Sequence, residues 1–264
     1  VDANRDGVYS LQHSLDGSML AVGFGDGSME FVSTMTGKLE HETRRHRLGT
    51  LAVMCIRFIP HQPHLCLAGT SIGRVYSCRM DDAHVEELIH EPDNEINCLD
   101  FSFDGDHFAT AGKDLDIRIY DTKTNQLIKS YEGYHKSSAD QAPGHAQRIF
   151  SLKYHPDREH MMVTGGWDNH LKVWDTRTRD GIQRTINGPH LDIKGKHVLT
   201  GSWRASDALQ IWDFAEGELV QNVPVHCGDQ GEFLYCAQFC DNGVVVAGGS
   251  GTNSIQAINV DTKQ

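Results

Sequence analysis

The sequence predicts an all-β protein made of repeated four-stranded sheets, and three observations lead to this expectation. Short segments rich in apolar and β-branched residues recur along the chain, for example HFATAG at 107–112 and MMVTGG at 161–166. Gly, Asp and Asn residues form turns between them, and no segment of ten or more residues has a convincing amphipathic helical pattern. The segments return at a period of roughly 40–45 residues, which is typical of a repeat array rather than of a single active-site motif.

Length, composition and charge narrow the class further. The chain has 264 residues, of which 39% are hydrophobic, and this is enough for the full core of one or two domains. We expect one domain, residues 1–264. The net charge of −12 argues against nucleic acid or an anionic membrane as the main partner, because both require a dense Lys/Arg surface. No apolar run approaches the roughly 20 residues of a membrane helix, and no signal peptide is visible. The first residue is Val1, so a removed targeting segment stays open.

Six units align on the segment that contains Trp174. Each unit has an apolar strand, a small-residue turn that usually holds Asp or Asn, and a second strand of alternating pattern. The position of Trp174 is matched by Val32, Cys78, Tyr120, Trp212 and Asn259. The steps between successive positions are 46, 42, 54, 38 and 47 residues.

Two further strands complete each unit. An alternating strand precedes the pair, and the sequence predicts these strands at 8–14, 53–59, 96–102, 149–155 and 234–240. Another strand follows the pair, as in QLIKSYEGYH, GIQRTINGPH and GELVQNVPVH. Four short antiparallel strands per unit are what a β-propeller needs, because each sheet then buries both faces against its neighbours.

With these units in place, the chain resembles the WD40-repeat β-propeller family over essentially its whole length. The clearest match is the fourth blade, which begins with Gly144-His145 and closes with Trp174-Asp175. The resemblance implies that His145, Thr164, Asp168 and Trp174 form one hydrogen-bonded chain across the blade. A buried indole N–H needs an acceptor, and a carboxylate in a tight turn orders an imidazole. We therefore expect Asp168 to be a structural turn residue and not a catalytic acid.

The same set recurs in two other blades. In blade three the expected members are Thr110, Asp114 and Tyr120, with His90 upstream. In blade five they are Thr200, Asp207 and Trp212, with His190 upstream. Blades one, two and six depart from the pattern, because Val32-Ser33, Cys78-Arg79 and Asn259 stand where the Trp-Asp pair is expected. Their internal polar network must be absent or different.

Three segments do not fit a regular ring. The polar stretch 136–144 has the composition of a flexible loop. Only seven residues separate His190 from Val198, so either blade five is abbreviated or residues are missing from the sequence. The polar segment Val1–Gly7 makes a poor closing strand. We therefore expect further material beyond one terminus, and seven blades in the parent protein are an open alternative to six.

The resemblance also implies a partner surface. In such propellers the turn between the second and third strands lies on the same face as the loop that enters each blade, and partners dock there. The residues expected on this face are Phe24, Lys113, Arg148, Trp167, Trp203, Arg204 and Glu232. Exposed Trp and Arg are the types that anchor interfaces. The alternative, that Trp167 and Trp203 pack sideways on neighbouring blades, stays open.

Motifs for metal, cofactor or catalytic chemistry do not emerge from the sequence. Sixteen His residues are present, but they show no zinc-site spacing, and there is no CxxC or HExxH. No GxSxG, no assignable Ser/His/Asp set and no GxxxxGK occurs. We expect no cofactor and no metal. The seven Cys residues lie mostly in apolar strands and are interpreted as reduced core residues of an intracellular protein.

These observations favour a non-catalytic interaction scaffold or adaptor, a subunit of a larger intracellular assembly that binds a protein or peptide on the propeller rim. No nucleic acid or membrane partner is expected, and the oligomeric state stays open. Two alternatives come from other classes: a propeller enzyme with a site in the central channel, and a reader of modified peptide tails. For the compartment we expect the cytoplasm, with the nucleus and the cilium as alternatives.

Overall fold

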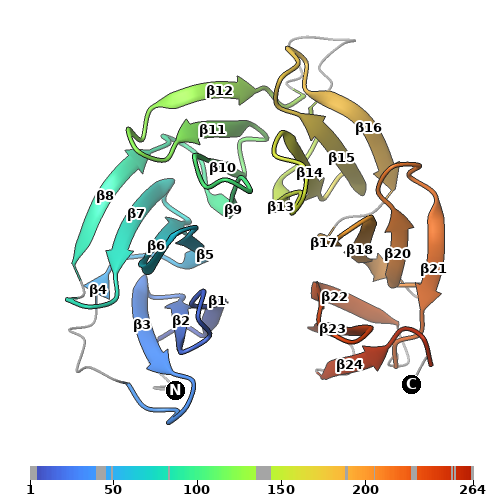
Figure 1. Cartoon of the computed structure of the whole chain (residues 1–264), viewed down its shortest axis with the longest axis horizontal. Coiled ribbons are helices and arrows are strands. Elements are labelled where there is room, and N and C mark those ends of the chain that lie inside the picture. The colour runs from blue at the N-terminus through green and yellow to red at the C-terminus, as the bar shows by residue number, and fades with distance from the viewer. Residues whose placement is uncertain are drawn as a thin grey trace. The chain divides into compact units, whose positions relative to one another are not determined.

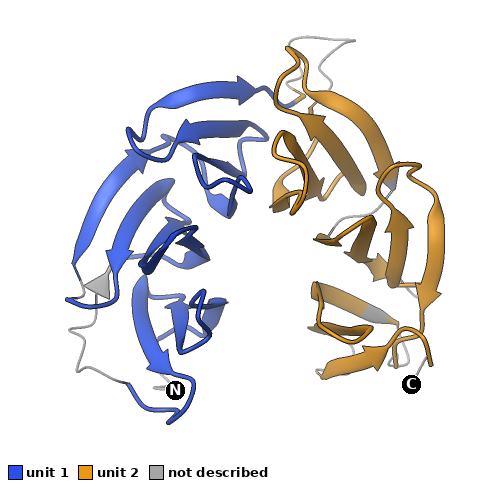
Figure 2. Cartoon of the chain, viewed as in Figure 1, with its two compact units in different colours: residues 1–133 blue, residues 134–264 orange. Residues whose placement is uncertain are grey.

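A computed structural model of the chain describes residues 5–39, 46–48, 50–82, 84–134, 144–187, 190–204, 206–226, 231–250, 252 and 254–262. For His46, Arg47, Asn187, His190 and Glu232 it describes the backbone alone. The described residues form strands and turns, and none of them lies in a helix that could cross a membrane. The chain divides into two compact units, Val1–Gly133 and Tyr134–Gln264, which Figure 2 draws in different colours. The single domain expected from the sequence remains a prediction.

Unit 1 contains three four-stranded antiparallel sheets in its described residues, which we call blades one to three (Figure 1). Blade one consists of β1 (Val8–His13), β2 (Met19–Phe24), β3 (Ser28–Ser33) and β4 (His46–Arg47). Blade two consists of β5 (Val53–Ile59), β6 (Gln62–Thr70), β7 (Arg74–Arg79) and β8 (Val85–His90). Blade three consists of β9 (Ile96–Phe101), β10 (His107–Gly112), β11 (Ile117–Asp121) and β12 (Leu127–Tyr131).

Unit 2 contains blades four to six, again with four strands in each described sheet. Blade four consists of β13 (Ile149–Tyr154), β14 (Met161–Gly166), β15 (His170–Asp175) and β16 (Ile182–Asn187). Blade five consists of β17 (His190–Lys194), β18 (His197–Gly201), β20 (Leu209–Asp213) and β21 (Leu219–Val223). Blade six consists of β22 (Glu232–Phe239), β23 (Val244–Ser250) and β24 (Ile255–Asn259). The short β19 (Trp203–Arg204), from the turn region of blade five, joins this sheet beside the first strand β22, at the edge opposite to the one that the fourth strand occupies in the other blades.

The predicted fold class, all-β with six four-stranded blades, is confirmed. The strands expected from alternation appear where the pattern places them, since β1, β5, β9, β13 and β22 begin within two residues of the predicted starts. Alternation succeeds as a signal because successive side chains of a strand point to opposite faces of its sheet.

The hydrophobic core lies between successive blades of each unit. One cluster joins blades one and two through Phe31, Ile56 and Phe58, and the next joins blades two and three. In unit 2 one cluster joins blades four and five, and another joins blades five and six through residues such as Leu199 and Leu234. A blade therefore buries both faces only when it has a neighbour, which is why a sequence of this kind needs repetition.

Small residues near the ends of second strands allow this close packing. A Cβ atom on Gly23 would lie 2.8 Å from the Val53 side chain of the next blade, and one on Gly69 would lie 2.8 Å from Ile96. Both distances are shorter than normal van der Waals contact, so any larger residue would push adjacent sheets apart.

The short segment between His190 and Val198 holds both a strand and a tight turn. Strand β17 begins at His190 and pairs with β18 from His190↔Gly201 to Lys194↔His197, so only Gly195 and Lys196 lie between the paired residues. Gly195 has a φ of 57°, a conformation that glycine adopts without steric cost. The first strand of blade five is therefore intact, and the chain is shortened in the connections around it. The expectation that His190 stands upstream of that strand is wrong.

Blade six corrects one alignment. Strand pairing places Val245 opposite Ile258, as it places Met162 opposite Trp174 in blade four. Ile258, which is buried, is thus the equivalent of Trp174, and the match to Asn259 is wrong by one residue. Asn259 instead caps the following turn, where its Oδ1 accepts the N–H groups of Asp261 and Thr262. Asp175 and its equivalents Asp121 and Asp213 play the same part.

The cysteines follow the sequence expectation with one exception. Cys55, Cys66, Cys78 and Cys98 are buried free thiols, whereas Cys236 is an exposed free thiol on β22. Burial raises the pKa of the Cys55 thiol to about 12, so this group stays protonated. Cys227, the loop residues 135–143 and the arginines at 44 and 45 lie outside the described residues.

Candidate functional site

Blade four contains a continuous chain of hydrogen bonds from Trp174 to Asp168. The Nε1–H of Trp174 donates to Thr164 Oγ1 over 2.8 Å, and Thr164 Oγ1 lies 2.7 Å from His145 Nε2. His145 Nδ1 lies 2.9 Å from Asp168 Oδ2. The backbone N–H of Ala146 also donates to this carboxylate. These hydrogen bonds link the third strand, the second strand, the loop before the first strand and the turn. They therefore connect four separate parts of one blade.

The geometry defines the protonation state of His145. A carboxylate only accepts, so the Nδ1–H of His145 donates to Asp168, and Nε2 is left to accept the hydroxyl proton of Thr164. Burial lowers the pKa of His145 below 6.5, although the nearby charge of Asp168 opposes this effect. Burial also disfavours the charge on Asp168, but His145 and the backbone N–H groups of Ala146 and His170 together outweigh burial and lower the pKa of that carboxyl. When His145 is neutral and Asp168 is ionised, every donor in this series of hydrogen bonds has an acceptor.

This arrangement predicts acid sensitivity in unit 2. The folded-state pKa of His145 lies below its ordinary value of 6.5, so the unfolded chain takes up the proton first. The stabilisation is present above pH 6.5 and is lost as the pH falls through the lowered pKa. His155, buried against Phe214, has a pKa lowered in the same direction by burial and by Arg158. We expect the urea midpoint, followed by tryptophan fluorescence, to fall between about pH 7 and pH 5. In the His145→Gln variant this fall should be smaller, and a midpoint that rises on acidification would contradict the assignment.

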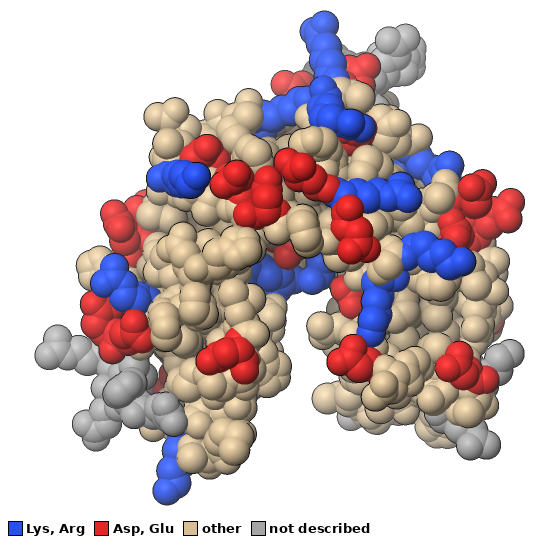
Figure 3. All heavy atoms as spheres, in the orientation of Figure 1, with Lys and Arg blue, Asp and Glu red and all other residues tan. Residues whose placement is uncertain are grey.

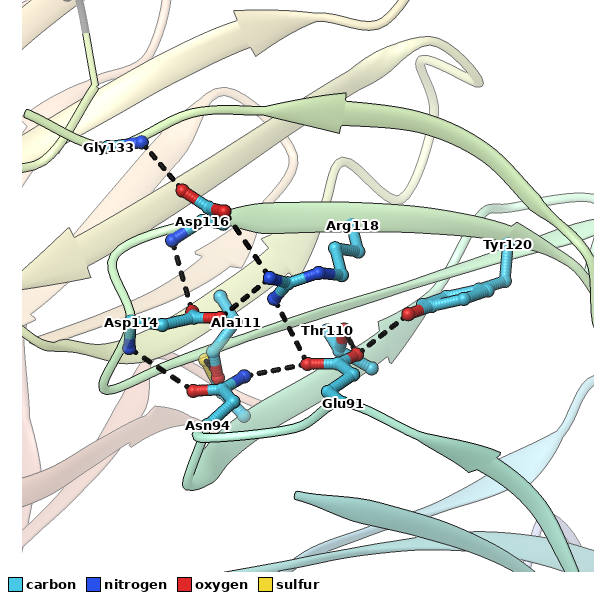
Figure 4. A network of polar contacts seen from close by, with 10 residues as sticks. Glu91, Asn94, Thr110, Ala111, Asp114, Asp116, Arg118, Tyr120 and Gly133 are labelled. Carbon is cyan, nitrogen blue, oxygen red and sulfur yellow. Dashed lines mark hydrogen bonds and ion pairs between the residues drawn. The ribbon is translucent and has the colours of Figure 1, made fainter.

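Blade three replaces the histidine by a buried carboxylate (Figure 4). Glu91 Oε1 accepts hydrogen bonds from Thr110 Oγ1 over 2.5 Å and from the Tyr120 hydroxyl over 2.9 Å. Glu91 Oε2 accepts from Asn94 Nδ2 over 2.6 Å and lies 3.2 Å from Arg118 Nη1. One carboxylate thus accepts from four side chains.

Glu91, and not His90, is therefore the upstream member of the blade-three set. Glu91 precedes Thr110 by 19 residues, the same separation as between His145 and Thr164. His90 is the last residue of β8 and is exposed. Glu91 does not follow from a histidine pattern, although the constant 19-residue spacing identifies it. Asp114 joins the network through an ion pair of 2.6 Å with Arg118 Nη2, and its backbone N–H donates to Asn94 Oδ1 over 3.2 Å, but it does not contact Glu91 or Thr110 as Asp168 contacts His145.

The charges of this network balance around Arg118. Burial opposes the charge on its guanidinium, but Asp114, Glu91 and Asp116 together outweigh burial and raise its pKa. Burial and the adjacent charge of Glu91 raise the pKa of Tyr120, so its hydroxyl remains a donor. Asp116 also accepts the backbone N–H of Gly133 over 2.9 Å and so joins the turn to the end of the outer strand. The network therefore holds the blade together.

Blade five retains the Trp–Thr hydrogen bond of the blade-four set and lacks the contact made by Asp168. Trp212 Nε1 donates to Thr200 Oγ1 over 3.1 Å, as in blade four. Asp207 does not take the place of Asp168. It has a φ of 55° and matches Asn169 in blade four, at 59°, and Leu115 in blade three, at 75°. The cause is length: Thr200 and Trp212 lie 12 residues apart, against 10 for Thr164 and Trp174. The expected network role of Asp207 is therefore wrong, and it is the left-handed turn residue.

The two extra residues of blade five form the strand β19. Trp203 pairs with Phe233 and Arg204 pairs with Glu232, both on the first strand of blade six. The Nε1–H of Trp203 donates to the carbonyl of Leu234 over 3.1 Å, and the N–H of Leu234 lies 3.3 Å from the carbonyl of Ser202. This strand fastens the turn of blade five to blade six.

An exposed group of aromatic rings lies at this junction. We call it the aromatic patch, and its members are Phe150, Trp167, Trp203, Phe233 and Tyr235. The centroids are 4.7 Å apart for Phe150 and Trp167, 6.1 Å for Trp167 and Trp203, and 5.2 Å for Trp203 and Tyr235. Trp167 and Trp203 are each 46% exposed and Tyr235 is 52% exposed. Both tryptophans thus contact neighbouring blades and still present half of their surface to solvent.

The remaining expected rim residues differ in their surroundings. Phe24 is 3% exposed, with the Arg5 guanidinium 4.7 Å from its ring centroid, so the expectation of an accessible Phe24 is wrong. Lys113 is exposed and forms an ion pair of 2.7 Å with Glu95. The carbonyl of Arg148 accepts the N–H of Trp167 over 3.0 Å, which places Arg148 beside the aromatic patch. The side chain of Glu232 lies outside the described residues.

Among the described residues no group of three or more His, Cys, Asp or Glu side chains could hold a metal ion. The described side chains form two kinds of arrangement. Buried polar chains brace individual blades, and one exposed aromatic surface joins three successive blades of unit 2.

Repeated four-stranded blades, each braced from a Thr on the second strand to an aromatic residue on the third, define a propeller-type repeat protein. A family model described as WD40, "WD domain, G-beta repeat", matches residues 84–121 and 137–175, which include the Glu91 and His145 sets. Two segments of the chain therefore match the WD40 repeat, and the six all-β blades agree with a WD40-type β-propeller.

Several curated proteins are similar to the chain. "Cilia- and flagella-associated protein 52" of Sus scrofa is 25% identical over 237 residues, which cover 84% of this chain and 34% of that protein. "WD repeat-containing protein 1" of Rattus norvegicus is 35% identical over 87 residues, 33% of this chain and 13% of that protein. "Coronin-like protein" of Saccharomyces cerevisiae is 26% identical over 164 residues, 54% of this chain and 25% of that protein. None of these three has an enzyme name. The chain spans about a third of the length of the ciliary relatives it matches.

Proposed function

We propose that the chain is a non-catalytic interaction module that binds a protein or peptide partner through the aromatic patch. The observation that carries this proposal is the pair of half-exposed tryptophans, Trp167 and Trp203, held in fixed positions by hydrogen bonds from Trp167 N–H and Trp203 Nε1–H. Rigid aromatic side chains bury a large area at a small cost in conformational entropy, and Trp is therefore enriched among interface residues with large energetic effects.

The charge of the surface supports a protein partner over a polyanion. On the face drawn in Figure 3, Lys and Arg side chains are interspersed with Asp and Glu in both units. Together with the net charge of −12, this pattern does not provide the continuous basic surface that phosphate backbones require. We place the module in a larger intracellular assembly, and the relatives named for cilia and flagella make a ciliary complex one setting to examine.

Replacing Trp167 by Ala tests the proposal most directly, because its side chain makes fewer structural contacts than that of Trp203. We expect partner affinity to fall at least about tenfold, as is common for a central aromatic anchor. The melting temperature should stay close to that of the wild-type chain. Affinity capture with quantitative mass spectrometry, followed by titration of the captured partner in purified form, measures the effect.

The matched control is Phe103→Ala, which removes another exposed aromatic side chain that belongs to unit 1 and is not a member of the patch. It should leave partner binding unchanged. If every captured partner remains at the same abundance and affinity with Trp167→Ala, the assignment of this surface is wrong.

A further inference from the structure

The aromatic patch offers a hydrogen-bond donor as well as ring faces. The indole N–H of Trp203 is committed to the carbonyl of Leu234. Trp167 differs, because within the described part of the chain its indole Nε1–H donates to no protein acceptor. Its ring is held by Phe150 on one side and Trp203 on the other. A fixed indole N–H that points from a half-exposed ring is suited to a carbonyl oxygen supplied by a ligand.

The rings are inclined to one another rather than laid flat. The planes of Trp167 and Trp203 meet at 54°, those of Trp203 and Tyr235 at 77°, and those of Trp203 and Phe233 at 85°. Inclined rings leave notches between their faces, and such notches accept compact, rigid, apolar groups.

Resting on the proposed function, we propose that the aromatic patch binds a proline-rich segment in the polyproline II conformation. Pyrrolidine rings are compact and apolar and fit notches between inclined aromatic rings. The polyproline II backbone has no internal hydrogen bonds and presents carbonyl oxygens to its surroundings, which is what the Trp167 Nε1–H needs. The segment is already ordered before it binds, so its loss of entropy is small.

The spacing of the rings agrees with this ligand. Successive centroids along Phe150, Trp167, Trp203 and Tyr235 are 4.7, 6.1 and 5.2 Å apart. Polyproline II rises about 3.1 Å per residue, so each ring step corresponds to roughly two residues and the row to about five or six. A short segment therefore contacts blades four, five and six together.

Charge beside the patch selects among proline-rich segments. Arg204 follows Trp203 on β19 and is exposed, and Arg148 lies next to Trp167 through the backbone contact described above. The exposed cationic side chain of Arg204 at the border of an apolar surface favours a ligand that has carboxylates next to its prolines. The class of partner is thus a proline-rich segment flanked by Asp or Glu.

The test uses synthetic peptides and the purified full chain. The probes are decaproline, decaproline preceded by two Asp, decaproline preceded by two Lys, and an alternating Gly-Ser peptide of equal length. All four tryptophans lie in unit 2, and Trp167 and Trp203 are half exposed, so binding should shift the fluorescence emission to the blue. The exposed Cys236 is adjacent to Tyr235, and bound peptide should protect it from alkylation. Affinities in the range of about 10 μM to 1 mM are expected for so small a surface.

We expect decaproline to bind and the Gly-Ser peptide not to bind. The Asp-bearing peptide should bind at least about threefold more tightly than the Lys-bearing one at low salt, and this difference should shrink at high salt. Trp167→Phe keeps an aromatic ring and removes the donor, and should weaken decaproline binding at least about fivefold. Phe103→Ala should not change it.

The inference is overturned if decaproline gives neither the blue shift nor the protection of Cys236 at about 5 mM, where a millimolar site would be mostly occupied. It is equally overturned if a trimethyl-lysine peptide binds in preference to decaproline, or if Trp167→Phe binds decaproline as well as the wild-type chain. Failure here is distinguishable from failure of the proposed function, because a captured partner that still depends on Trp167 would keep the patch as an interface for a different ligand.

Discussion

Replacing Glu91 by Ala should cost about 3–5 kcal/mol of unfolding free energy, because it removes the shared acceptor of a buried network. Thr110, Tyr120 and Asn94 would each lose their bond to this carboxylate, and Arg118 would lose one of its three carboxylate partners. Stranded buried donors carry their full desolvation cost, which makes this effect larger than that of a single surface ion pair. Unit 1 contains no tryptophan, so chemical denaturation is best followed by far-ultraviolet circular dichroism.

Two further variants define the cause of that loss. Glu91→Gln keeps an oxygen for Thr110 and Tyr120 and removes the charge opposite Arg118, so we expect it to lose less than the Ala variant. Glu86→Ala removes an exposed carboxylate from β8, the strand that ends directly before Glu91, and should stay within about 0.5 kcal/mol of the wild-type chain. A Glu91→Ala chain as stable as Glu86→Ala would show that the network contributes nothing net.

Replacing Trp174 by Ala should cost unit 2 about 3–5 kcal/mol, the range for removing a large aromatic side chain from a packed core. Trp174 is 1% exposed, and its Nε1–H ends the chain through Thr164 and His145 to Asp168. The loss combines a cavity with an unsatisfied acceptor, and the midpoint of guanidinium denaturation measures the sum.

Trp174→Phe separates those two contributions, because it keeps a buried ring and removes the donor. We expect it to lose about 1–2 kcal/mol. Trp167→Ala removes the same side chain from a half-exposed position and should lose less than about 1 kcal/mol. Equal losses for Trp174→Ala and Trp167→Ala would contradict the structural role given to the blade-four chain.

The resemblance to the WD40 family predicted the four members of the blade-four set. Local sequence patterns were enough to predict the equivalents Val32, Cys78, Tyr120 and Trp212. These follow from alternation and from a constant distance along a hairpin, and neither depends on the rest of the molecule. The predictions were wrong where a residue type was expected instead of a spacing. At Glu91 the position agrees with the repeat and the chemistry differs, since a carboxylate paired with Arg118 performs the bracing that imidazole performs in blade four.

Insertions were the second source of error. Two extra residues between Thr200 and Trp212 moved Asp207 to a left-handed turn position and created β19. The sequence shows the longer hairpin, but a pattern cannot indicate that its extra residues pair with the next blade. Phe24 is a related case: its position in the turn was predicted, and its burial results from Arg5, whose position depends on a salt bridge to Glu30.

The order of strands, the six repeats and the bracing residues of blade four are therefore properties that the chain encodes locally, because side-chain alternation and turn geometry act over a few residues. Which rings meet at the aromatic patch, and which of them stay exposed, was decided only by tertiary packing. Phe150, Trp167, Trp203 and Tyr235 come from three blades, and their separations depend on how closely successive sheets pack and on the pairing of β19 with β22. Contacts between distant segments have no period along the sequence, so no local pattern can predict them.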